Sequence, residues 1–446
     1  MNIKALSIAL LATLFVSITS GCDITNLSSD SLLRPPKPVG DEAEIEQIIS
    51  DTAGGNYTLK YPKSGNHRSA ITMYDIDYDE NEEAIAFYRK ADDVAKIHML
   101  VMYSDNGEWK LSSDCITETT DVDCVDFAQI DGEGSLEIIV GYTTYSPNTN
   151  FLSCYRYTNG KTSEINAGQT YATFYCGDFT SDNKNEVMTL SLYTAENEAT
   201  ATMLDYNREN NTLYAKSTAS MDPNVIRFKN IQFTDLGDGC KGIVVDGEAA
   251  TTELSTQIIY YNKEMSLLRN PLYREKTQNV TRRNCSVLST DLDSDGIIEF
   301  PTVEKLPYSK NETAETVADK IIWNVLSTGN ESVAPKSNVI ANYSFNYTIK
   351  MPDKWLKDNV TAIHSTEDNT TAVYEWKNNK LGDKLFDIRV FETSEWEKGK
   401  NNDEYTLIYK DNKYAYTFRN TDTKSQLSLT DDEIKTAFSI LTETVI

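Results

Sequence analysis

The chain has 446 residues, of which 39% are hydrophobic and 25% are charged, and its formal net charge is −26. This length and composition indicate a soluble globular protein of about two or three domains. The 26 Tyr residues, together with many Thr and scattered turn residues, favour β-structure. A surface this acidic repels nucleic acid and anionic lipid headgroups, which argues against both as direct partners, and it attracts cations.

The first 22 residues have the pattern of an export signal. A basic start precedes the apolar run Ala5–Val16, whose 12 residues are too few to span a bilayer. The following Ser20-Gly21-Cys22 resembles a lipobox, although Thr19 stands where that pattern usually has Leu. The resemblance implies that signal peptidase removes residues 1–21 and that Cys22 carries lipid such as palmitate. We therefore expect a lipoprotein on the outer face of a bacterial plasma membrane, with an uncleaved anchor or ordinary secretion as the alternative.

Residues 22–54 are predicted to form a tether and a short helix. The tether is rich in Ser, Asp and Pro, and its segment Arg34–Pro38 contains three prolines, which exclude a helix interior. Residues 41–50 have the apolar periodicity of a helix, and Asp41 is the candidate N-cap. The apolar face of this helix would consist of Ile45, Ile48 and Ile49.

The most informative feature is a loop motif that recurs about every 50 to 60 residues. Each complete copy has alternating oxygen-bearing side chains, a closing acid at position nine and then an apolar strand. Copy one contains Asp75, Asp77, Asp79 and Glu83; copy two contains Gln129, Asp131, Glu133 and Glu137; copy three contains Asp178, Thr180, Asp182 and Glu186. Copy four, which begins at Asp235, is degenerate, and copy five contains Asp291, Asp293, Asp295 and Glu299.

The period of this motif matches a four-stranded blade, with the loop between its two inner strands and a hairpin between its two outer strands. Asp105-Asn106-Gly107 and Asn159-Gly160 lie where the outer hairpins belong. Blades around an axis form a β-propeller, so residues 55–340 are predicted to form about five blades. The loops resemble the FG-GAP and VCBS repeats of integrin-like propellers. The segment from residue 33 to residue 88 also resembles a group of clostridial lipoproteins that contain these repeats.

The loops are candidate Ca²⁺ sites, because Ca²⁺ takes about six to eight oxygen ligands. Copy five is the most complete, since it has carboxylates at positions one, three, five and nine and Gly296 at the turn. Copy one lacks the Gly, copies two and three include neutral ligands, and copy four lacks the closing acid. The loops are not EF-hands, because Thr302 stands where the twelfth-position acid belongs. Calcium would be structural, and an acidic turn held by Asx-type hydrogen bonds is the alternative.

Residues 341–446 are predicted to form an α+β domain, an antiparallel sheet with a C-terminal helix. The expected strands cover residues 343–350, 371–376, 385–391, 405–409 and 414–418. Thr430 and Glu433 predict a capping box at the start of the helix. Its apolar face would consist of Ile434, Ala437, Phe438 and Leu441. The Pro352-x-x-Trp355 segment resembles the opening of PsbP-like or Mog1-like domains. Core packing is the expected use of Trp355, Trp376 and Trp396.

The sequence contains no recognisable catalytic motif. The three His residues have neither metal nor triad spacing, and the six Cys residues after Cys22 favour buried thiols, with Cys115–Cys124 the one local pair worth testing as a disulfide. We therefore expect a non-catalytic module that binds an extracellular glycan, peptide or envelope protein. A propeller-type glycoside hydrolase, with carboxylates converging at an axial pocket, and an accessory subunit of an envelope complex are the alternatives.

Overall fold

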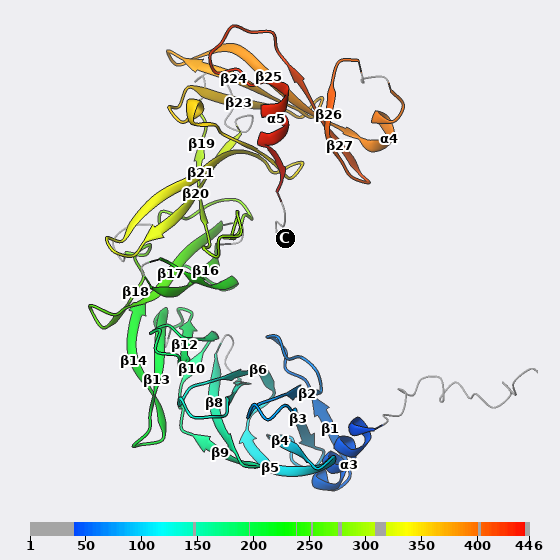
Figure 1. Cartoon of the computed structure of the whole chain (residues 1–446), viewed down its shortest axis with the longest axis vertical. Coiled ribbons are helices and arrows are strands. Elements are labelled where there is room, and N and C mark those ends of the chain that lie inside the picture. The colour runs from blue at the N-terminus through cyan, green and yellow to red at the C-terminus, as the bar shows by residue number, and fades with distance from the viewer. Residues whose placement is uncertain are drawn as a thin grey trace, which may run out of the picture.

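The computed structural model describes residues 40–145, 149–195, 197–237, 239–250, 253–274, 279–307, 318–399 and 403–441. The expected signal peptide, the lipidation residue Cys22 and most of the tether therefore lie outside the described residues. Within the described ranges, no helix is both long enough and apolar enough to cross a membrane. The chain is mainly β, and its antiparallel sheets follow one another along an arc in a propeller-like arrangement (Figure 1).

The first sheet lies at one end of the arc and is covered by helix α3 (Figure 1). Its strands are β1 (Tyr57–Lys60), β2 (Ile71–Tyr74), β3 (Glu83–Lys90), β4 (Lys96–Asp105) and β5 (Glu108–Glu118). Helix α3 (Asp41–Ala53) buries Ile45 and Ile49 in a cluster with Tyr88 of β3. The N-cap of α3 is Gly40, so the prediction that Asp41 caps this helix is wrong, and Asp41 lies in the first turn.

Three further sheets continue the arc. The second comprises β6 (Val122–Ala128), β7 (Glu137–Thr143), β8 (Asn150–Thr158), β9 (Lys161–Ile165) and β10 (Thr170–Tyr171). The third comprises β11 (Thr173–Gly177), β12 (Glu186–Ser191), β13 (Thr200–Asn207) and β14 (Thr212–Ser220). The fourth comprises β15 (Arg227–Asp235), β16 (Lys241–Ala250), β17 (Glu253–Asn262) and β18 (Leu267–Arg269).

The last two sheets contain the C-terminal part of the chain. The fifth sheet comprises β19 (Phe300–Lys305), β20 (Asp319–Ser327), β21 (Ser332–Asn342), β22 (Tyr347–Lys350) and β28 (Phe438–Ile440). The sixth comprises β23 (Val360–Ser365), β24 (Thr370–Lys377), β25 (Lys380–Glu392), β26 (Thr406–Lys410) and β27 (Tyr414–Asn420). Three short helical elements accompany these sheets: η2 (Asp353–Trp355), α4 (Thr393–Trp396) and α5 (Asp431–Ala437).

The repeat seen in the sequence corresponds to one sheet per copy. In the first four sheets the acidic loop joins the innermost strand to the next strand. In the fifth sheet the loop precedes β19, and a bridge between Thr290 and Glu299 takes the place of the innermost pairing. The two predicted outer hairpins are confirmed. Asn106-Gly107 joins β4 to β5 and Asn159-Gly160 joins β8 to β9, all four residues with positive φ as a type I′ turn requires.

The C-terminal segment is tied to the fifth sheet. The predicted domain boundary at residue 340 falls inside β21, and β28 returns after α5 to pair with β22. One continuous core joins Ile340 and Ile349 of the fifth sheet to Trp355 and to the inner face of the sixth sheet. The capping box of Thr430 and Glu433 is confirmed. The predicted helical face is wrong beyond Ala437, because Phe438 begins strand β28.

Candidate cation-binding loops

Four of the five acidic loops share one construction. We call residues 75–83, 129–137, 178–186, 235–242 and 291–299 loops one to five. In every loop except loop four, the closing Glu is buried and accepts a hydrogen bond from the backbone N–H of the second loop residue; it begins a strand in loops one to three and immediately precedes β19 in loop five. The donors Ile76, Ile130, Phe179 and Leu292 lie 2.9, 2.8, 2.9 and 2.8 Å from Glu83, Glu137, Glu186 and Glu299.

The backbone path is also shared among these four loops. The fourth and sixth loop positions have positive φ in each of them, whichever residue stands there. In loop one these positions are Tyr78 (60°) and Glu80 (71°), whereas in loop five they are Ser294 (60°) and Gly296 (84°). The missing Gly of copy one therefore does not change the turn. In loop one Glu80 instead adopts a positive φ, a backbone conformation that is uncommon for residues other than Gly.

Loop five is the best match to a calcium loop in sequence, yet a lysine from a distant strand lies among its carboxylates. Lys336 Nζ, on β21, is 2.9 Å from Asp293, 2.7 Å from Asp295 and 2.5 Å from Glu299. These contacts hold the pKa of Asp295 below its usual range. Asp291, Asp293 and Asp295 also each place one carboxylate oxygen within 4.8 Å of the other two, but here one ammonium group supplies part of the positive charge that Ca²⁺ would supply.

Loop two is compensated by an arginine. Arg156 Nε lies 2.7 Å from Asp131 and 3.7 Å from Glu137, and Arg208 lies 2.6 Å from Glu133 at the surface. The pKa of Glu137 is nevertheless raised to about 7, because its burial outweighs the opposing effects of hydrogen bonds and of Arg156. A cation is thus already present at this loop.

Loops three and four differ again in how their polar groups are satisfied. In loop three, the Thr180 hydroxyl donates to Glu186 at 2.6 Å, and Lys241 lies 3.7 Å from Asp178. In loop four, the carbonyl oxygen of Cys240 accepts the hydrogen bond from Leu236 N–H at 2.8 Å. That carbonyl replaces the closing acid whose absence the sequence predicts.

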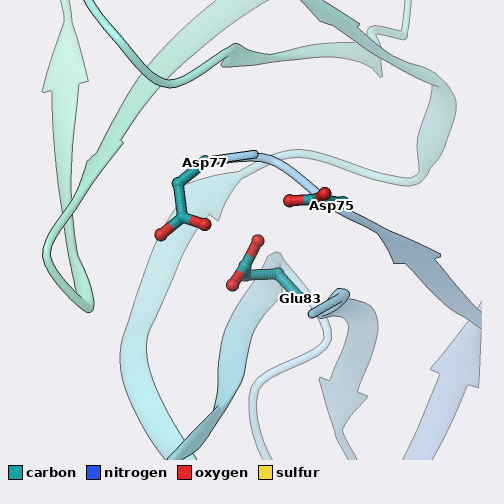
Figure 2. A group of neighbouring side chains, drawn as sticks. All are labelled: Asp75, Asp77 and Glu83. Atoms are coloured by element: carbon teal, nitrogen blue, oxygen red, sulfur yellow. The ribbon is translucent and has the colours of Figure 1, made fainter. Parts of the chain in front are cut away.

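Loop one is the exception, because its carboxylates face one another without a counter-charge. Figure 2 shows the side chains of Asp75, Asp77 and Glu83 close to one another, and among the described residues no basic side chain lies within ion-pair distance of these three or of Asp79. One carboxylate oxygen from each of Asp75, Asp77 and Glu83 lies within 4.8 Å of the other two. Asp75 Oδ1 and Asp77 Oδ1 are inaccessible to solvent and have no hydrogen-bond partner in the described structure.

The electrostatics of loop one follow from this arrangement. The pKa of Glu83 is raised to about 7, first by burial and then by repulsion from Asp77, Asp79 and Asp75, against the opposing hydrogen bond from Ile76. Burial and the same repulsion raise the pKa of Asp77. Tyr157 Oη, 3.5 Å from Glu83, is a weak additional donor. This cluster can be neutralised by protons or by a hard cation.

The thiols and histidines have ordinary surroundings. Cys115 and Cys124 are both free thiols, and no disulfide joins them. Burial raises the pKa of the Cys124 thiol, which therefore stays protonated. His98 is buried between Asp114, at 2.9 Å, and Tyr88, at 3.1 Å, within the first sheet. Trp355 is fully buried, and its ring N–H donates to the Leu427 carbonyl oxygen at 2.8 Å.

A second feature is a cavity of about 580 Å³ lined by the innermost strands β6, β11 and β15. Asp123 and Asp126 of β6 both line it. Burial raises the pKa of Asp126. Asp123 accepts hydrogen bonds from Tyr171 at 2.8 Å and from Asn150 at 3.0 Å. The sequence motif does not identify this cavity, because its residues come from three different sheets.

Comparisons with known proteins add little to this description. No protein-family model matches the chain, and no curated protein matches it. A solved structure of a protein from Lactobacillus plantarum is similar with 8% identity and a TM-score of 0.32, over 72% of this chain and 85% of that one. Saccharomyces cerevisiae Sqt1 is similar with 10% identity and a TM-score of 0.32, over 81% and 86% of the two chains. We therefore interpret the loops and the cavity from their own residues.

Proposed function

We propose that this chain is a lipid-anchored, non-catalytic binding or scaffold module whose propeller-like sheets are stabilised by structural calcium at loop one. The observation that carries the calcium proposal is the uncompensated cluster of Asp75, Asp77 and Glu83. Ca²⁺ binds carboxylate oxygens at about 2.3–2.6 Å, so ligands around one ion lie up to roughly 5 Å apart. The separation of these oxygens fits that requirement, and the two unpartnered oxygens gain a partner when the ion binds.

Calcium binding is tested by isothermal titration calorimetry on the full chain and on two matched variants. Asp77→Asn removes one charge from loop one, and Asp293→Asn makes the same change at the third position of loop five. We expect one Ca²⁺ per chain, lost in Asp77→Asn and retained in Asp293→Asn, because Lys336 already pairs with three carboxylates of loop five. Equal loss in both variants, or no binding by the parent chain, would refute the assignment.

The anchor is proposed at Cys22 on the basis of the Ser20-Gly21-Cys22 signal. Two acyl chains suffice for stable attachment to a membrane. Labelling of cells with radioactive palmitate should mark the chain, and Cys22→Ala should abolish the label and release the protein from the membrane fraction. Retention of the label in Cys22→Ala would contradict the proposal.

The finer architecture is also a proposal: five blades, one per loop, followed by a C-terminal α+β module. One sheet per loop supports the blade count, and α5 with the sixth sheet supports the module. The shared core around Trp355 implies that the module and the fifth blade unfold together. Hydrogen exchange should therefore protect β21 and β25 with the same opening free energy, and independent opening of β25 would argue against a shared unit.

A second candidate, a propeller-type glycoside hydrolase, is favoured by one observation. Asp123 and Asp126 share the cavity, and the raised pKa of Asp126 suits a general acid. Release of reducing sugar from plant or microbial polysaccharides, abolished in Asp126→Asn, would establish this activity. Saccharide binding without turnover would favour the non-catalytic function.

A further inference from the structure

Two cavities of the structure share part of their lining. The first, described above, has a volume of about 580 Å³. The second, of about 840 Å³, lies between β15, residues 287–293 and the fifth sheet. Lys229 and Asn230 of β15 line both cavities. We call these two neighbouring cavities, whose lining residues come from more than one sheet, the trough.

The first cavity has aromatic walls that are held in place. Phe174, Tyr175 and Phe228 line it and are half-buried. Tyr175 of β11 stacks on Phe233 of β15, with ring centroids 5.5 Å apart and planes 11° apart. Because this stack spans two sheets, the ring of Tyr175 keeps a fixed orientation. The cavity thus presents preorganised apolar faces without requiring a ligand to order them.

Three of the four charged side chains that line the first cavity already have partners, and burial raises the pKa of the fourth, Asp126, which favours its uncharged form. Arg227 and Lys229 both pair with Glu248, at 2.6 Å and 3.4 Å. Asp123 is satisfied by donors from Tyr171 and Asn150. A strongly charged ligand would have to disrupt these pairs, whereas an uncharged polar ligand keeps them.

The aromatic walls and the amide side chains of the trough suit a saccharide better than a peptide. A saccharide unit has an apolar C–H face that stacks on an aromatic ring and hydroxyl groups that both donate and accept hydrogen bonds. Asn66 at the mouth and Asn230 between the cavities offer amides of that dual character. A peptide would instead add a strand to a free sheet edge. At β15 the side chains of Asn230 and Gln232 already bind the Ser289 carbonyl oxygen, at 3.3 and 2.7 Å, across that edge.

We infer that the trough binds a neutral glycan chain, with one sugar ring stacked in the first cavity against Tyr175. This inference rests on the proposed binding function and names its ligand class and its site. It assigns Asn66 and Asn230 to the recognition of sugar hydroxyls, and it makes the second cavity the continuation of the binding site for further sugar units.

The full chain is tested against neutral hexasaccharides of glucose, xylose, mannose and galactose, first on an array and then by calorimetry with the best binder. Tyr175→Ala should weaken binding about tenfold, and Asn66→Ala by about threefold to tenfold. Tyr214→Ala is the matched control, since Tyr214 is exposed on the outer strand of the same sheet, and it should leave the affinity unchanged. Asn66 is exposed, so Asn66→Ala should fold normally. This variant therefore still tests the site if Tyr175→Ala does not fold.

The inference would be overturned if the chain bound none of the neutral hexasaccharides, or if it bound only anionic glycans or peptides. It would also be overturned if the parent chain and Asn66→Ala bound the sugar with equal affinity. The calcium titration separates this failure from failure of the proposed stabilisation. Calcium uptake at loop one without sugar binding would refute the glycan site alone. Sugar binding without calcium uptake would refute the calcium site and leave the glycan site standing.

Discussion

Protons and calcium should compete for loop one, and this competition gives a prediction with a defined pH range. The pKa of Glu83 is raised from 4.5 to about 7 in the folded chain. The folded chain binds the Glu83 proton more tightly than the unfolded chain does, so protonation favours the folded state. This contribution to the free energy of unfolding is complete below about pH 4.5 and is lost as the pH rises through about 7. The calcium-free chain should therefore become less stable between pH 5 and pH 8.

The two pKa values of Glu83 set an upper limit on this loss of stability. The difference between 4.5 and about 7 corresponds to at most roughly 3 kcal/mol. Neighbouring Asp79 is exposed to solvent, which screens part of the repulsion, so about 1–2 kcal/mol is a more realistic expectation. For a chain of this length this corresponds to a decrease in melting temperature of roughly 2–6 °C. Calcium replaces the proton, so its stabilisation should be small at pH 5.5 and large at pH 8.

The assay is thermal melting with and without 1 mM Ca²⁺ (about 100 times an assumed Kd of 10 μM), at pH 5.5 and at pH 8. Glu83→Gln should flatten part of the pH dependence of the melting temperature and remove most of the calcium response, because an amide neither titrates nor supplies a charged ligand. The variant should still fold, because the amide oxygen can accept the hydrogen bond from Ile76. Glu299→Gln, the same position in loop five, is the matched control and should keep the calcium response at pH 8. Glu137, with a pKa of about 7, contributes to the pH dependence that remains, as do Asp77, Asp126 and Glu186, whose pKa values are also raised. A calcium response that is independent of pH, or that survives in Glu83→Gln, would refute the reasoning.

Three other predictions follow from single contacts. Lys336→Met removes the ammonium group from loop five, so calorimetry should count two Ca²⁺ per chain instead of one; an unchanged count would mean that Lys336 does not block the site. Asp246→Ala should lower the free energy of unfolding by about 3–5 kcal/mol in urea titrations, because it leaves the fully buried Arg283 without its partner; a loss below 1 kcal/mol would show that water compensates that charge. Trp355→Ala should cost about 3–5 kcal/mol and loosen β22 together with the sixth sheet, and hydrogen exchange that changes in the sixth sheet alone would contradict the shared core.

The elements that depend on near neighbours in the chain could be predicted from sequence. The Asn-Gly hairpins require only two consecutive residues with positive φ. The capping box of α5 requires only Thr430 and Glu433. The start of β28 was not predictable from the local pattern, because Phe438 continues the apolar periodicity of α5 and becomes a strand only by pairing with Ile349 of β22.

The sequence by itself determined the acidic loops and the mainly β character of the chain, because loops and strands depend on residues within a few positions of one another, and it determined the repeat period, which can be counted along the chain. Only the tertiary structure decided which loop lacks a counter-charge. Lys336 reaches loop five from β21 and Arg156 reaches loop two from β8, whereas no basic residue in the described structure reaches loop one. The motif that looks most complete in sequence therefore has a lysine among its carboxylates in the fold. Compensation depends on distance in space, and a ligand motif read along the chain does not contain that information.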